Sequence, residues 1–157
     1  MIAKILRITT DNNFRKKVVL TLETMALRGC PATVAESLRT VEQQALKVAK
    51  GLSKTMASNH LAGADGLARA ADICHAIKGW DAPRRFWWIL GANCHARGMG
   101  WGGLFGLDYN QREMVVSAIK ELRRNGFPLK HELYQVKLGW DVAHVENVNN
   151  WPLEDNS

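Results

Sequence analysis

The strongest hydrophobic periodicity in the chain lies in residues 32–57. Apolar side chains recur there at alternating intervals of four and three positions, at Val34, Leu38, Val41, Ala45, Val48 and Leu52. Such spacing gathers apolar side chains on one face of an α-helix and leaves the intervening polar residues on the other. The pattern therefore predicts one long helix over residues 32–57.

The segments before this helix are shorter and less distinct. β-Branched residues in residues 2–9 predict a short strand. Residues 14–28 fit two structures, because Val18 and Leu22 belong both to a strand-like alternation and to a helical spacing. A strand here would pair with residues 2–9 as a hairpin. We favour a helix, because Gly29 follows as a suitable helix stop.

Three further helices are predicted downstream. Alanine-rich residues 65–78 have apolar positions at helical spacing. A short helix follows, with Asp81 as its cap and Pro83 in its first turn, where proline's missing N–H costs nothing. Residues 109–124 form the third helix, and the preceding Asp108 can form a capping box with the residue three positions later, Gln111.

The remaining segments complete a predicted fold class. The glycine-rich residues 98–106 are expected to supply tight turns and close packing, and the alternation in residues 130–140 predicts a half-buried strand. We therefore expect a mainly α fold: a single helical domain of about five helices with one or two short peripheral β elements. The domain would span residues 1–140, and residues 141–157 would form an acidic, mobile C-terminal tail.

Length and composition indicate the class of protein and its cellular location. Its 157 residues, 46% of them hydrophobic, suit one globular domain with a real core. No apolar run is long enough to span a membrane, and the first residues lack the pattern of a signal peptide. The three cysteines have no framework spacing, which indicates reduced thiols. These features predict a cytoplasmic protein.

Motifs for catalysis or cofactor binding are weak. Two Cys-His pairs, Cys74-His75 and Cys94-His95, contain residue types that bind zinc or form nucleophile–base dyads. Adjacent helical side chains diverge by about 100°, however, so neither pair suits one ion or one dyad. The glycine-rich segment lacks the lysine of a phosphate-binding loop, and no two carboxylates have an evident acid/base spacing. We therefore predict no catalytic residue, no metal ligand and no cofactor, and disfavour an enzyme.

The aromatic and basic residues between 80 and 106 carry the functional hypothesis. The net charge is +6, and the positive charge lies in residues 1–130. An outward Trp88 between Arg84 and Arg85 could stack on a base while the arginines bind phosphates. The helix 109–124 and the following strand also have the order of a recognition helix and wing. The candidate binding residues are Arg84, Arg85, Trp88, Trp101, Arg112, Lys120, Arg123 and Arg124, with a second patch at Lys47, Lys50 and Lys54.

The sequence thus predicts a small, basic, non-enzymatic protein that binds DNA or RNA through lysine and arginine contacts and an exposed tryptophan. The alternative is a helical protein–protein interaction module, either a subunit of a larger complex or a small inhibitor of one, because Trp and Arg also dominate protein interfaces. A third interpretation places Trp88 in the core, in which case residues 80–106 would have only a structural role. The exposure of Trp88 distinguishes the binding interpretations from this one.

Overall fold

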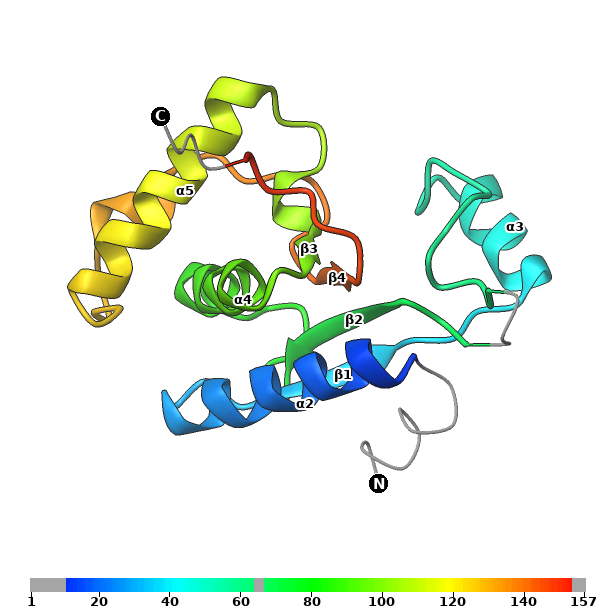
Figure 1. Ribbon diagram of the computed structural model, residues 1–157, viewed down its shortest axis with the longest axis horizontal. Coiled ribbons are helices and arrows are strands. Elements are labelled where there is room, and N and C mark those ends of the chain that lie inside the picture. The colour runs from blue at the N-terminus through cyan, green and yellow to red at the C-terminus, as the bar shows by residue number, and fades with distance from the viewer. Residues whose placement is uncertain (1–10, 64–66, 154–157) are drawn as a thin grey trace.

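The computed structural model describes residues 11–63 and 67–153 and has an α+β architecture (Figure 1). The strands are β1 (Ala32–Glu36), β2 (Ala70–His75), β3 (Gly100–Trp101) and β4 (His144–Glu146). The helices are α2 (Asn12–Leu27), α3 (Val41–Ala49), α4 (Arg84–Arg97) and α5 (Tyr109–Arg124), with 3-10 turns η1 (Gly102–Leu104) and η2 (Glu132–Gln135). The strands form an antiparallel sheet in the order β1-β2-β4-β3. The prediction of a mainly α domain with about five helices is therefore wrong.

Helices with strong local end signals were predicted well. Helix α2 confirms the helix expected over residues 14–28, and the left-handed backbone at Gly29 follows its end. Helix α5 confirms the helix over residues 109–124, with the Asp108–Gln111 capping box in place. Helix α4 begins at Arg84 after Pro83 rather than at an Asp81 cap, and it continues to Arg97.

Residues 32–57 do not form one helix. Their first residues are β1, and α3 begins only at Val41, where Thr40 and Gln43 form a capping box. Gly51, with a φ of 70°, follows the end of α3. The apolar spacing spans two elements, because pairing of residues 32–36 with β2 outweighs their helical pattern. The side chain of Val41 is exposed as a result.

Two other predicted elements are also wrong. The helix predicted over residues 65–78 is replaced by β2, a nearly continuous buried run that lacks the alternation of a half-buried strand. The strand predicted over residues 130–140 is η2 followed by irregular chain. No strand of the described residues pairs with it; instead the Arg84 guanidinium donates hydrogen bonds to the carbonyl oxygens of Tyr134 and Val136. The strand predicted over residues 2–9 lies outside the described residues.

Helix α4 forms the centre of the core and packs against both α2 and α5 (Figure 1). Its aromatic residues Phe86, Trp87 and Trp88 are buried. The indole N–H of Trp88 donates to the carbonyl oxygen of Tyr134 at 3.1 Å, so its one polar group is satisfied inside the protein. Trp88 is 0% exposed. The exposed, base-stacking Trp88 expected from the sequence is therefore a core residue.

The glycine-rich segment allows close packing, as expected. A Cβ atom at Gly91 or Gly103 would overlap the ring of Trp101, and one at Gly102 would overlap the carbonyl oxygen of Asp141. The backbone N–H of Asp141 donates to the carbonyl oxygen of Gly102 at 3.3 Å. Residues 102–103 thus support the segment that leads into β4.

Part of the predicted acidic tail belongs to this packed structure. Residues 144–146 form β4, and the indole N–H of the buried Trp151 donates to the carbonyl oxygen of Met99 at 2.8 Å. The division of the chain into residues 1–140 and a mobile tail of residues 141–157 itself stays a prediction. No helix within the described ranges is long and apolar enough to cross a membrane.

Candidate metal centre

The register of the sheet places three polar residues in one row across β1, β2 and β4. Glu36 pairs with Asp72, and Asp72 pairs with His144 on the other side of β2. Cross-strand partners project from the same face of a sheet. The fold therefore holds a carboxylate and an imidazole side by side on rigid strands.

A loop after α3 adds His60 to this row. The backbone N–H of Arg39 donates to the carbonyl oxygen of His60 at 2.7 Å, and His60 Nδ1 lies 2.7 Å from the carbonyl oxygen of Ser37. These contacts fasten the loop to the chain that follows β1. His60 is buried and turns its other ring nitrogen toward Asp72 and His144.

Three ligand atoms converge in this cluster. His60 Nε2 lies 3.2 Å from both Asp72 Oδ1 and His144 Nδ1, and His144 Nδ1 lies 3.5 Å from Asp72 Oδ1. Zinc bonds of about 2.0–2.1 Å in a tetrahedron separate neighbouring ligand atoms by about 3.4 Å. The spacing of the three atoms fits a metal ion bound between them.

The hydrogen bonds around the cluster favour the protonation that a metal ion requires. A carbonyl oxygen can only accept, so His60 Nδ1 carries the proton toward Ser37 and leaves Nε2 with a lone pair. Likewise His144 Nε2 lies 3.0 Å from Glu146 Oε2 and donates to it, which frees Nδ1 for a metal. Metal-binding histidines usually have such a partner on the second nitrogen. The two free lone pairs face each other and need a cation between them.

Without a metal, a proton takes this place. Burial disfavours the imidazolium, but hydrogen bonds to Asp72 and Glu146 outweigh burial and raise the pKa of His144 to about 9. Burial also opposes ionisation of Asp72, yet hydrogen bonds from His144 and His60 hold the pKa of that carboxyl well below its usual range. Glu146 likewise has a lowered pKa, because the hydrogen bonds from His144 and Asn59 outweigh its burial. The site therefore presents ionised carboxylates to a cation at neutral pH.

The cluster lies in a cleft of about 850 Å³ between the α3 segment and the sheet. Two further charged residues line it. Arg39 is buried, with Nε 2.5 Å from Glu36 Oε1, an Nη2–Oδ2 distance of 3.8 Å to Asp72 and a hydrogen bond to the amide oxygen of Gln44. Asp141 has a raised pKa because of burial, to which the negative charge of Asp72 adds. The cleft therefore holds the three ligand atoms, a fixed cation and a carboxyl that binds protons more readily than usual.

The arginines expected to bind phosphates mostly bind the protein's own backbone. Arg85 donates to the carbonyl oxygen of Phe127, Arg112 to that of Leu107 and Arg123 to that of Ala92. Arg84 is similarly engaged, as described above. Arginines whose donors are used this way hold loops and helices together. Trp101, the second expected stacking residue, is also 0% exposed.

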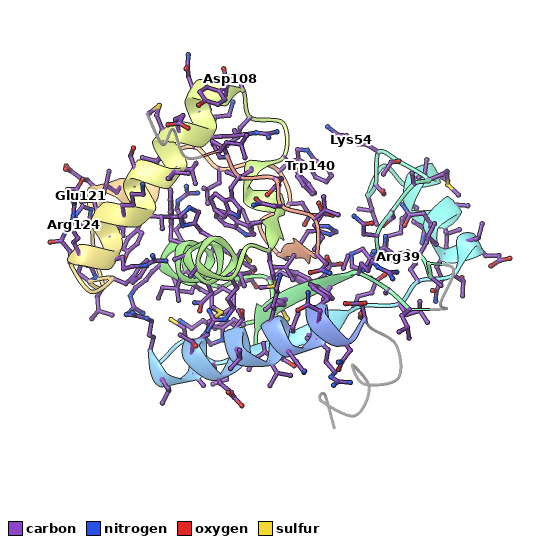
Figure 2. The ribbon with its side chains drawn as sticks, viewed as in Figure 1. Arg39, Lys54, Asp108, Glu121, Arg124 and Trp140 are labelled. Carbon is purple, nitrogen blue, oxygen red and sulfur yellow. The ribbon has the colours of Figure 1, made fainter. Side chains whose placement is uncertain are left out.

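The other predicted binding residues are scattered. Lys120 and Arg124 are exposed on α5, and Figure 2 shows Arg124 far from the cleft. Lys50 is exposed just after α3. Lys47 lies 3.2 Å from Glu36 at the cleft, and the ammonium of Lys54 lies 5.1 Å from the centre of the Trp140 ring. The structure thus brings Lys47 to the cleft and Lys54 to the cleft residue Trp140, and it leaves Lys120 and Arg124 elsewhere.

Cys74 and Cys94, the cysteines of the two Cys-His pairs, are poor nucleophiles. Cys94 is fully buried on α4, and burial raises the pKa of its thiol. Burial and the nearby Asp72 charge also raise the pKa of Cys74. A thiol is a weak nucleophile until it is deprotonated. Both Cys-His pairs are therefore incidental to the cluster.

The sequence analysis missed the cluster. One local signal was available: Asp141, His144 and Glu146 stand at intervals of three and two residues. A histidine that binds a metal ion often donates its other ring N–H to a nearby carboxylate, so a histidine flanked by two carboxylates is a weak signal of a metal site. His60 and Asp72 have no such signal, because only the sheet and the loop bring them to His144.

Comparison with known proteins identifies a solved structure with a similar fold. The sequence matches no family model and no curated protein. Among solved structures, the crystal structure of the Serratia marcescens L-Ala D-Glu endopeptidase ChiX is similar, with a TM-score of 0.54 and 16% sequence identity. The match covers 90% of this chain and 81% of that one. The likeness establishes a shared fold.

This fold and the cluster overturn the functional predictions. A small non-enzymatic nucleic-acid-binding protein and a helical interaction module were both inferred from a helical domain with an exposed Trp88. The chain instead has an α+β fold similar to that of the ChiX structure, and its cleft contains a candidate metal centre while Trp88 is buried. Whether it has a protein partner stays a prediction.

Proposed function

We propose that this protein is a zinc-dependent hydrolase of peptide bonds. The observation that carries the proposal is the convergence of His60 Nε2, Asp72 Oδ1 and His144 Nδ1 within 3.5 Å of one another inside an open cleft. Three protein ligands with a further position left for water or substrate are the usual arrangement of catalytic zinc sites. A structural site would more often use four protein ligands.

Zinc at this position would polarise an amide carbonyl and lower the pKa of water, which provides a nucleophile at neutral pH. The two histidines and Asp72 would hold the ion. Glu146 and the Ser37 carbonyl would keep each imidazole in the required tautomer and orientation.

Asp141 is proposed as the general base. It lines the same cleft, three residues before His144, and its raised pKa brings it closer to the range in which a carboxylate accepts a proton effectively. It would take the proton from the attacking water and pass it to the leaving amine. The backbone hydrogen bond from Asp141 to Gly102 holds this segment in place.

Arg39 is proposed to stabilise negative charge that develops on the carbonyl oxygen. Its guanidinium is fixed by Glu36 and Gln44 and lines the cleft. A fixed positive charge in a partly dehydrated site stabilises a developing oxyanion without reorganisation. Gln44 in turn holds the loop after α3, through hydrogen bonds from Nε2 to the Ser53 hydroxyl oxygen and the Thr55 carbonyl oxygen.

The proposed substrate is a peptide that contains an L-Ala–D-Glu bond. The support is the shared fold with the Serratia marcescens L-Ala D-Glu endopeptidase. The cleft has a volume of about 850 Å³ and is lined by Trp80 and Trp140 as well as by the cluster, so a peptide could contact all of them. The cytoplasmic location inferred from the sequence also remains a proposal, supported by three free, buried cysteines.

The proposal is tested by hydrolysis of a synthetic acetyl-L-Ala-D-Glu peptide, followed by mass spectrometry of the products. Purified protein with one equivalent of Zn²⁺ is expected to cleave the L-Ala–D-Glu bond, and a chelator should stop the reaction. Asp72→Asn should abolish cleavage, whereas His131→Asn, a control at the residue that caps η2 outside the cleft, should leave it unchanged. Zinc-independent cleavage, or no cleavage of any amide, would refute the proposal.

A further inference from the structure

The two exposed tryptophans lie in the same cleft. Trp80 is 59% exposed and Trp140 is 50% exposed, whereas the other four tryptophans are buried. Both exposed rings line the cleft that holds the metal-ligand cluster. A large apolar ring left in water beside a reactive site is a natural contact surface for a ligand.

Trp140 lies very close to the cluster. Phe105 packs between them, with ring centroids 5.4 Å from Trp140 and 5.3 Å from His144. One aromatic residue therefore separates Trp140 from a proposed metal ligand. A peptide residue that contacts Trp140 would therefore lie near the amide that is cleaved at the cluster.

Lys54 approaches Trp140 from the opposite side of the cleft. Figure 2 shows Lys54 on the α3 side and Trp140 on the opposing side, with the lysine directed across the gap. The ammonium lies 5.1 Å from the ring centre. Two chain segments, from different parts of the sequence, thus place a cation over an exposed aromatic ring.

Lys54 lies over the ring of the cleft residue Trp140, and its contacts differ from those of the basic residues that line the cleft. Lys47 pairs with Glu36, and Arg39 pairs with Glu36 and Asp72. Among the residues that the structure describes, no carboxylate pairs with Lys54. Its ammonium lies against the Trp140 ring, where it can attract an anion that enters the cleft.

We propose that Lys54 and Trp140 form a subsite for a carboxylate-bearing residue next to the scissile amide. Lys54 would bind the carboxylate, and the Trp140 ring would contact the aliphatic part of the same side chain. The inference rests on the proposed peptidase function and adds a preference for acidic peptides and the residues that determine it. Lys54 therefore has a role in peptide specificity, in place of the phosphate binding expected from the sequence.

The test measures binding to the metal-free protein, so that it does not depend on catalysis. Isothermal titration calorimetry compares acetyl-L-Ala-D-Glu amide with acetyl-L-Ala-D-Gln amide, which has nearly the same shape but no charge. The wild-type protein should bind the acidic peptide about fivefold more tightly, the upper range of an exposed ion pair. Lys54→Met should remove this preference and leave binding of the neutral peptide unchanged.

Three matched variants complete the experiment. Lys54→Arg keeps the charge and should keep the preference. Lys50→Met removes an exposed lysine from outside this cleft and should also keep it. Trp140→Ala should weaken binding of both peptides. Thermal unfolding of each variant confirms that it is folded.

The outcomes separate this inference from the proposed function. Equal binding of the two peptides by the wild-type protein, an unchanged preference in Lys54→Met, or no measurable binding would overturn the subsite. A Lys54-dependent preference without hydrolysis by the zinc-loaded protein would support the subsite and refute only the peptidase. Hydrolysis with no dependence of binding on Lys54 would support the peptidase and refute only the subsite.

Discussion

Asp72 and His144 are direct cross-strand partners, and their side-chain atoms Oδ1 and Nδ1 lie 3.5 Å apart. Because both sit on paired strands, their separation is set by the backbone of the sheet rather than by a flexible loop. His60 reaches the same point from a loop that hydrogen bonds to Ser37 and Arg39. A site built this way keeps its geometry before the metal binds, and this pre-organisation underlies the following predictions.

Replacement of a proposed ligand should abolish zinc binding. Asp72→Asn is expected to raise the zinc dissociation constant by more than about 100-fold, because it removes both a bond and a negative charge. Competition with a fluorescent zinc chelator measures the change. His131→Asn should retain the wild-type affinity. An Asp72→Asn protein that still binds one zinc ion with the original affinity would exclude this residue as a ligand.

Glu146 should increase the zinc affinity of the site by orienting His144, without itself binding the metal. Glu146→Gln keeps the length of the side chain but loses the negative charge that orients His144, so zinc affinity should fall by about 10- to 100-fold. Glu132→Gln, on η2, is the matched control. The same chelator competition decides the matter, and an affinity equal to that of the control would show that Glu146 has no such role.

Asp141 should affect catalysis and not metal binding. Asp141→Asn is expected to lower kcat by about 10²- to 10⁴-fold, the usual contribution of a general base. Only the ionised carboxylate accepts a proton, so wild-type activity should fall as pH decreases through the raised pKa of Asp141. The decrease in activity at low pH should be absent from the pH–rate profile of the Asp141→Asn variant. If kcat is unchanged, or zinc is lost together with activity, Asp141 is not the base.

The metal-free protein should lose stability as pH rises. The pKa of His144 is raised to about 9 in the folded state. A group whose folded pKa is raised contributes fully below its unfolded pKa, about 6.5, and this contribution is lost as pH rises through the folded value. Urea unfolding of the metal-free protein at pH 6 and pH 9.5 measures the effect. His144→Asn should show a smaller decrease in the free energy of unfolding over this range, and an equal decrease would contradict the assignment.

Core and cleft tryptophans should respond differently to truncation. Trp88→Ala removes a buried ring with a hydrogen-bonded N–H, and it should lower the free energy of unfolding by about 3–5 kcal/mol. Trp80→Ala removes a mostly exposed ring and should cost under about 1 kcal/mol. Denaturant titration monitored by circular dichroism compares them. Similar losses in the two variants would contradict the burial of Trp88.

Local signals in the sequence predicted part of the fold. The capping box of Asp108 and Gln111 predicted α5, and the Gly29 stop supported α2, because both signals act within a few residues. Strands β1 and β2 have no comparable signal. Their short apolar runs also fit helical spacing, and only their pairing with each other makes these segments strands.

The candidate site was less predictable than the fold, because it is non-local. His60 lies 12 residues from Asp72 and 84 residues from His144 in the sequence. Their convergence depends on a sheet register that the sequence analysis did not anticipate. The clustering of tryptophan and arginine was visible, but the same residue types build either a surface or a core, and Trp88 belongs to the core.

We propose that one zinc ion at His60, Asp72 and His144 makes this protein a peptidase. The most direct measurement is the rate of acetyl-L-Ala-D-Glu peptide hydrolysis as Zn²⁺ is added stepwise to the metal-free protein. We expect no hydrolysis without zinc, a linear increase in rate up to one equivalent per chain, and no activity at any point in Asp72→Asn. Full activity in the metal-free protein, or none at one equivalent, would refute a zinc-dependent peptidase.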